Sequence, residues 1–169
     1  GDDAIVDLCS GSSGPLPFLR DELEARRGPL RVVLTDKYPH LAAYRAAHAR
    51  SDGRVGYRAE PVDATAVPAD LLGVRTLFAS LHHFKPRQVQ AILADAVRQR
   101  RGIGIFEGTE RTLRAVVMTA VMGPLFALGA TPAIRPFRWG RLVWTYLLPV
   151  IPLVTLWDGL VSCLRTYSI

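Results

Sequence analysis

Residues 4–14 read Ala-Ile-Val-Asp-Leu-Cys-Ser-Gly-Ser-Ser-Gly, an apolar run followed by a turn of small residues. The run has the length of one buried β-strand, and the small residues after it predict a tight loop. Leu16, Leu19 and Leu23 come next at helical spacing, so the loop joins a strand to a helix. This strand–loop–helix unit begins the pattern that decides the fold.

The same alternation continues to about residue 110. The later predicted strands cover residues 31–35, 54–59, 74–79 and 103–107. The predicted helices cover residues 15–27, 39–50 and 86–101. Strands that alternate with helices form a parallel sheet with right-handed crossovers and helices on both faces, so we expect an α/β fold.

The sequence after residue 110 is apolar and basic. Residues 115–134 and 142–157 carry no charge. Six arginines and one carboxylate occur after residue 110, whereas the charges before it are nearly balanced. We therefore expect an α/β domain at residues 1–110 and an apolar, basic helical extension at residues 111–169.

Composition excludes several classes of protein. With 49% hydrophobic and 21% charged residues, the 169-residue chain is not disordered, collagenous or a coiled coil. The net charge of +6 gathers in the apolar last third, which favours a membrane surface or an acidic partner over nucleic acid. Two cysteines, Cys9 and Cys163, fit a reducing cytosol, and four histidines without ligand spacing predict no metal site.

Candidate ligand-binding residues follow the predicted strands, because ligands of open parallel sheets bind where the strands end. The small residues from Cys9 to Gly14 let a ligand approach the backbone closely. Asp36, 22 residues after Gly14, is placed to accept hydrogen bonds from a ribose diol. Further candidates follow the third and fourth predicted strands: Asp63, Ala64 and residues 80–84 (Ser-Leu-His-His-Phe).

Together these residues resemble the class I S-adenosylmethionine-dependent methyltransferases. Residues 6–14 are similar to that family's first motif, in which an acidic residue in the first strand precedes a glycine-rich turn. The resemblance covers roughly residues 4–108, and it has Cys9 and Ser13 where the family favours glycine. It implies a doubly wound, Rossmann-like parallel sheet with strand order 3-2-1-4-5, here followed by an apolar helical C-terminal extension.

The resemblance also implies S-adenosylmethionine as the cofactor and assigns binding roles to residues. Asp36, with Lys37 beside it, would bind the ribose hydroxyls, and Asp63 with Ala64 would bind the adenine. Asp7 would steady the loop that cradles the methionine end. The full set of expected cofactor contacts is Asp7, Cys9, Gly11, Ser12, Gly14, Asp36, Lys37, Asp63, Ala64, Ser80 and Leu81.

His82 and His83 belong to the segment that lines the active site in small-molecule members of the family, and an imidazole there could accept a proton. Structural interpretations remain open beside the functional ones. A histidine could instead satisfy a backbone carbonyl, Asp36 could cap the next helix, and Asp63 could cap a turn. Cys9 has nothing near it in sequence that would activate a nucleophile, so it is interpreted as a small loop residue.

Three functions are compatible with this pattern. We favour S-adenosylmethionine-dependent methyl transfer to a small, hydrophobic acceptor. The alternative is a non-catalytic module that keeps the sheet and binds a partner or a membrane surface through its apolar segment. A nicotinamide-dependent oxidoreductase fits less well, because Cys9 occupies the first glycine slot of G-x-G-x-x-G and Asp63 would have no role.

The apolar extension has two further interpretations. Residues 115–134 are long enough to span a bilayer, but we expect Gly123-Pro124 to interrupt the helix. A span would also place Arg135 and the arginines after it on the far side, against the positive-inside bias. We expect a buried cover or hydrophobic lid over the substrate site, or else a monotopic patch with tryptophans at the headgroups. The protein is expected in the cytoplasm, with peripheral membrane contact or a homodimer through the fifth strand or the apolar segment.

Overall fold

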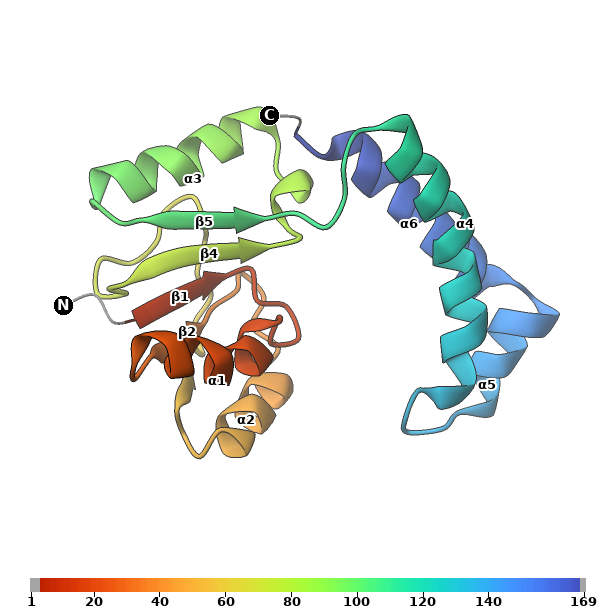
Figure 1. The fold of residues 1–169 in the computed structure, drawn as a ribbon, viewed down its shortest axis with the longest axis horizontal. Helices are drawn as coiled ribbons and strands as arrows, with labels where there is room; N and C mark the ends of the chain where they lie inside the picture. Colours follow the sequence, from red (N-terminus) through yellow and green to blue (C-terminus); the bar gives the residue numbers. More distant parts are fainter. Residues whose placement is uncertain (1–3, 168–169) are drawn as a thin grey trace. The chain divides into compact units, whose positions relative to one another are not determined.

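The computed structural model describes residues 4–167, which form two compact units that divide between Gly108 and Thr109. The first unit is a three-layer α/β fold (Figure 1). Its strands are all parallel, in the order β3-β2-β1-β4-β5. They are β1 (Ala4–Leu8), β2 (Arg31–Leu34), β3 (Val55–Tyr57), β4 (Val74–Phe78) and β5 (Ile103–Phe106). The predicted Rossmann-like sheet and its strand order are confirmed.

Helices lie on both faces of this sheet, as the alternation predicted (Figure 1). On one face, α1 (Leu16–Arg27) and α2 (Leu41–Arg50) pack through Leu16 and Tyr44 onto β2. On the other, α3 (Pro86–Arg98) packs through Ile92 onto β1 and β4. Two buried apolar clusters, one on each face, therefore hold the strand ends in fixed positions.

The third strand is shorter than expected. The sequence predicts a strand over residues 54–59, but β3 covers only Val55–Tyr57. In the described chain no helix connects β3 to β4, and an irregular connection covers that part of the sheet instead. A cavity of about 310 Å³ remains beneath the connection, and its lining includes Ala4 and Arg31, the first residues of β1 and β2. None of the residues from Cys9 to Gly14 lines this cavity.

The second unit is a helical hairpin, in which α4 and α6 pack side by side along their length (Figure 1). The chain runs through α4 (Leu113–Ala130), η2 (Thr131–Ala133), α5 (Trp139–Leu142), the π-helix η3 (Val143–Leu147) and α6 (Val150–Arg165). The side chains of Thr109 and Thr166 hydrogen-bond at 2.6 Å, so the two ends of the unit lie together.

One expectation about the apolar segment is wrong. The helix α4 continues through Gly123-Pro124, because a proline removes a single N–H donor and a helix can accommodate that loss by a local adjustment. Ala127 is the one buried residue of α4. The stretch Leu113–Ala133 is long and apolar enough to cross a membrane.

Candidate functional site

The loop between β1 and α1 has a strained backbone. Cys9, Gly11, Ser13 and Gly14 all have a positive φ, at 60°, 52°, 101° and 60°. Glycine adopts this region readily, whereas Cys9 and Ser13 pay a steric cost for it. Cys9 and Ser13 therefore adopt a backbone conformation that glycine adopts more readily. Strain of this kind persists where the surroundings fix the backbone, as they do at ligand-binding loops.

The side chain of Asp7 holds this loop in place. Its buried carboxylate accepts hydrogen bonds from Ser10 Oγ and Thr76 Oγ1, both at 2.7 Å. Burial raises the pKa of Asp7 to about 6, although the two hydrogen bonds oppose that rise. A Cβ at position 14 would lie 3.1 Å from Asp7 Oδ2, so Gly14 lets the loop pass close to the carboxylate. Asp7 thus supports the loop from within the sheet.

Asp36 connects the end of β2 to the same loop. One carboxylate oxygen accepts a hydrogen bond from the backbone N–H of Gly11, and the other accepts one from Tyr38, both at 2.8 Å. The residue does not cap α2, which begins after His40. An acidic side chain at the end of β2 is therefore turned toward the loop at the end of β1, as the predicted site requires.

Asp63 lies at the same edge of the sheet, after β3. Its carboxylate accepts hydrogen bonds from the N–H and hydroxyl of Thr65, and it pairs with Lys37 Nζ at 2.8 Å. The hydrogen bonds from Lys37 and Thr65 lower the pKa of Asp63 to about 2, and Asp63 in turn raises the pKa of Lys37. The turn-capping interpretation of Asp63 is therefore correct, and Lys37 adds an ion pair that is open to solvent. Ala64, the next residue, is buried in the core.

The charges of all three carboxylates act on the thiol of Cys9. Burial, and then the charges of Asp36, Asp7 and Asp63, raise the pKa of the thiol to about 12. A thiol held protonated in this way is no nucleophile. Burial, and then the charge of Asp36, also raise the pKa of the buried Tyr44 of α2 to about 12. Sequence reasoning missed Tyr44, whose helical spacing is that of an ordinary core residue.

The end of β4 contributes a second group of polar residues. The buried hydroxyl of Ser80 lies beside the Cys9 thiol and has no nitrogen or oxygen partner. After it comes the short helix η1 (Leu81–His83). The backbone N–H of Leu81 donates to Glu107 Oε1 at 2.7 Å, and His82 Nδ1 lies 2.6 Å from Glu107 Oε2.

The sequence did not assign a role to Glu107, although it directly follows β5 at the edge where ligands bind. A carboxylate only accepts hydrogen bonds, so neutral His82 must carry its proton on Nδ1, which leaves Nε2 as an acceptor. For His82, the expected contact with a backbone carbonyl is therefore replaced by a contact with a carboxylate. The ring of His83 packs against that of His82 at a tilt of 43°, with ring centroids 4.2 Å apart.

These residues offer hydrogen-bond acceptors and exposed backbone to a polar ligand. Carboxylates at Asp36 and Asp63 can accept from a diol and an amino group, and the loop offers backbone atoms. Gly11 is exposed, and a Cβ there would meet nothing within 4 Å, so a ligand has access to it. Within residues 4–167, no group of three or more metal-ligating side chains is present.

No protein-family model, curated protein or solved structure matches this chain. The function is therefore inferred from the residues of the site.

Proposed function

We propose that the first unit binds S-adenosylmethionine and directs its methyl group to a small, apolar acceptor. The observation that carries this proposal is the contact between Asp36 and Gly11, which joins the acidic end of β2 to the strained loop after β1. A nicotinamide-binding site would use the same loop, but it would give no role to Asp63 or to the His82–Glu107 pair.

In this proposal each strand end binds a different part of the cofactor. Gly11, Ser12 and Gly14 cradle the methionine end while Asp7 supports their loop. Asp36 accepts hydrogen bonds from the ribose, and Asp63 with Ala64 contacts the adenine. The unpartnered hydroxyl of Ser80 and the segment beginning at Leu81 then lie at the reacting end.

S-adenosylmethionine supplies an electrophilic methyl group with an activated leaving group, so catalysis consists largely of positioning. His82 gives this site a proton acceptor. Glu107 keeps the imidazole in the tautomer whose Nε2 can take a proton, and it also holds the neighbouring backbone at Leu81. We therefore propose an acceptor that loses a proton on methylation, such as a hydroxyl, an amine or a carbon acid.

The apolar character of the acceptor and the location of the protein follow from the sequence that comes after β5. An apolar segment begins at Leu113, only a few residues beyond Phe106. We propose that the enzyme works in the cytoplasm at the membrane surface, where apolar acceptors concentrate. The first unit must then face the side on which the cofactor is made.

Titration calorimetry with S-adenosylhomocysteine tests the cofactor, using the full chain. Asp36→Asn keeps an acceptor for Gly11 but removes the charge, and it should weaken binding at least tenfold. Glu22→Gln, which removes an exposed carboxylate from α1, is the matched control and should change nothing. If Asp36→Asn binds S-adenosylhomocysteine as tightly as the native chain does, the proposed ribose contact is wrong.

Thermal unfolding with S-adenosylhomocysteine, NAD and FAD separates the proposed function from its alternatives. A ligand that binds only the folded state raises the melting temperature. We expect a shift with S-adenosylhomocysteine alone. A response to NAD alone would overturn the methyltransferase proposal, and a response to none of the three would favour a module that acts only through its apolar segment.

A further inference from the structure

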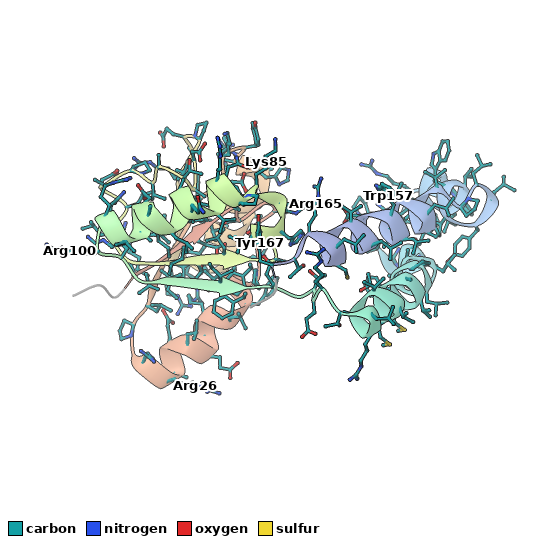
Figure 2. All side chains as sticks on the ribbon, turned by 90° about the horizontal axis from the view of Figure 1, so that it is seen from above. Arg26, Lys85, Arg100, Trp157, Arg165 and Tyr167 are labelled. Atoms are coloured by element: carbon teal, nitrogen blue, oxygen red, sulfur yellow. The ribbon has the colours of Figure 1, made fainter. Side chains whose placement is uncertain are left out.

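The hairpin of the second unit exposes apolar side chains on its outer surface. Along α4, two rows at four-residue spacing are about half exposed or more: Val117, Val121 and Leu125, and Met118, Met122 and Phe126. The helix α6 likewise exposes Leu153, Val154 and Trp157. Figure 2 shows Trp157 along α6 and Arg165 near the end of that helix. A soluble unit of this size rarely leaves so continuous an apolar surface open to water.

The inner seam of the hairpin is built from small residues. Thr119, Gly123 and Ala127 follow one another at four-residue spacing on α4, and Thr155, Gly159 and Cys163 do the same on α6. A Cβ at position 159 would lie 2.5 Å from the methyl group of Thr119, and one at 123 would lie 3.6 Å from that of Thr155. Cys163 Sγ contacts Thr119 Oγ1 at 3.4 Å. Close approach through small residues is typical of helices packed in lipid, where burial of apolar surface gives no driving force.

The threonine hydroxyl groups of the hairpin have hydrogen-bond partners within it. Each of the seven threonines between residues 109 and 166 has a hydrogen-bond partner. Four of them, among them Thr155 and Thr131, donate to the carbonyl four residues earlier in the chain. Such internal bonding removes the need for water, which is the condition that a bilayer imposes.

The charges lie at the two ends of the hairpin. Arg111, Arg114 and Arg165 flank the outer ends of α4 and α6, and three further arginines lie in the turn, at residues 135, 138 and 141. Between these ends, Leu113–Ala133 rises through 21 residues, or about 31 Å, which is close to the thickness of a bilayer's hydrocarbon core of about 30 Å. The arginines are therefore spaced to reach phosphate groups while the apolar rows lie between them.

From these observations we infer that the second unit inserts into a lipid bilayer as a helical hairpin. Arg111, Arg114 and Arg165, at the base of the hairpin where its two ends meet, would then lie at anionic headgroups. Both ends enter from the same side, because Thr109 and Thr166 are bonded to each other. This goes beyond surface contact and does not depend on the proposed methyl transfer. The arginines divide equally between base and turn, so the positive-inside bias does not oppose insertion.

Asp158 is the one carboxylate of the hairpin between Arg114 and Arg165, and it is exposed in the middle of α6. A charge at that depth opposes insertion, but the apolar rows on both helices contribute more free energy in favour of insertion than this one charge contributes against it. The bend of 71° between Trp139–Leu147 and Val150–Arg165 turns α5 and η3 away from the axis of α6. Trp139 and Trp144 on that bent segment are suited to the interface between headgroups and acyl chains.

The tryptophans make the test direct, since all three in the chain lie in the hairpin. The intrinsic fluorescence of the full chain is recorded with vesicles of phosphatidylcholine and phosphatidylglycerol. Insertion should shift the emission to the blue, and brominated phosphatidylcholine should quench it. The bound protein should resist extraction by high salt and by alkaline carbonate.

Two lysine substitutions provide a matched pair. Phe126 of α4 and Val97 of α3 are both exposed, at 72% and 77%, so in water both should tolerate lysine. In a bilayer, Phe126→Lys should lower vesicle partitioning at least tenfold, whereas Val97→Lys should leave it unchanged. Circular dichroism of both variants checks folding, and the native fluorescence decides the question if either variant fails to fold.

Three results would overturn the inference. One is tryptophan emission that vesicles leave unchanged. Another is complete release of the bound chain by high salt, which would mean adsorption at the surface. The third is a stable dimer in lipid-free buffer with the tryptophans already shielded, which would mean that a second copy covers the apolar rows.

Discussion

The carboxylate of Asp36 accepts a hydrogen bond of 2.8 Å from the backbone N–H of Gly11, although 25 residues separate them. A second N–H, that of Tyr38, donates to the same carboxylate at 2.8 Å. The end of β2 thus holds the loop after β1 in place before any ligand binds. A pre-positioned loop loses less conformational entropy on binding than a mobile one does.

Removing the Asp36 side chain should therefore loosen the loop even without a ligand. In Asp36→Ala, two backbone donors lose a charged acceptor, which we expect to lower the free energy of unfolding by about 1–3 kcal/mol. Hydrogen exchange at the amides of Gly11 and Tyr38 should quicken, while exchange in α3 stays unchanged. Equal protection of Gly11 in both proteins would show that the contact does not order the loop.

Asp7 should make the stability of the first unit fall as the pH rises. Burial raises its pKa to about 6 in the folded state, above the ordinary value of 3.8. Below about pH 4 the group is protonated in both states and costs nothing. Between about pH 4 and 6 it ionises in the unfolded chain first, so folding loses stability as the pH rises. Asp7→Asn should abolish this loss. Between pH 4 and pH 8 the free energy of unfolding of the variant should therefore rise by roughly 3 kcal/mol relative to that of the native chain. Urea unfolding of both proteins across that range measures it, and parallel curves would refute it.

Ser13 should be replaceable by glycine with a gain in stability. Its φ of 101° is unfavourable for any residue with a Cβ, so Ser13→Gly relieves strain of about 1 kcal/mol. Ser12→Gly is the matched control, because Ser12 has no positive φ and glycine there only adds freedom to the unfolded chain. Melting temperatures should move in opposite directions, and a fall in both would contradict the assignment of strain to Ser13.

Glu107 should set the tautomer of His82. The native protein should show His82 protonated on Nδ1 by ¹⁵N NMR at neutral imidazole, because the carboxylate accepts from that nitrogen. Glu107→Ala should let the other tautomer appear, and His82→Gln identifies the signals. Finding the native ring protonated on Nε2 would remove the proton acceptor from the proposed site.

Gly159 should tolerate alanine poorly although it lies within a helix. Alanine normally stabilises a helix relative to glycine by up to about 1 kcal/mol. At position 159, however, the new Cβ would lie 2.5 Å from the methyl group of Thr119. The Thr119 side chain would then have to move and lose its contact with Cys163. Gly129→Ala, whose Cβ meets nothing within 4 Å, is the control in α4. Thermal unfolding in detergent should show a loss for Gly159→Ala and a gain for Gly129→Ala, and matched gains would refute the close seam.

Much of the first unit could be predicted because its information is local. The spacing of Leu16, Leu19 and Leu23 and the apolar run at Ala4–Leu8 each specify one element, and parallel pairing then fixes where Asp36 must lie. The partner of His82 could not be predicted, because Glu107 reaches it through the pairing of two strands. The helix through Pro124 was also missed, since the penalty of proline depends on what surrounds the helix.

The hydrogen bond between Thr109 and Thr166 brings the first and last residues of the hairpin side by side. A segment closed in this way should be transferable as one piece. Grafted into a surface turn of an unrelated soluble protein, it would need only two neighbouring attachment points to keep its helix contacts. If the hairpin inserts into lipid as inferred, the host protein should then bind vesicles.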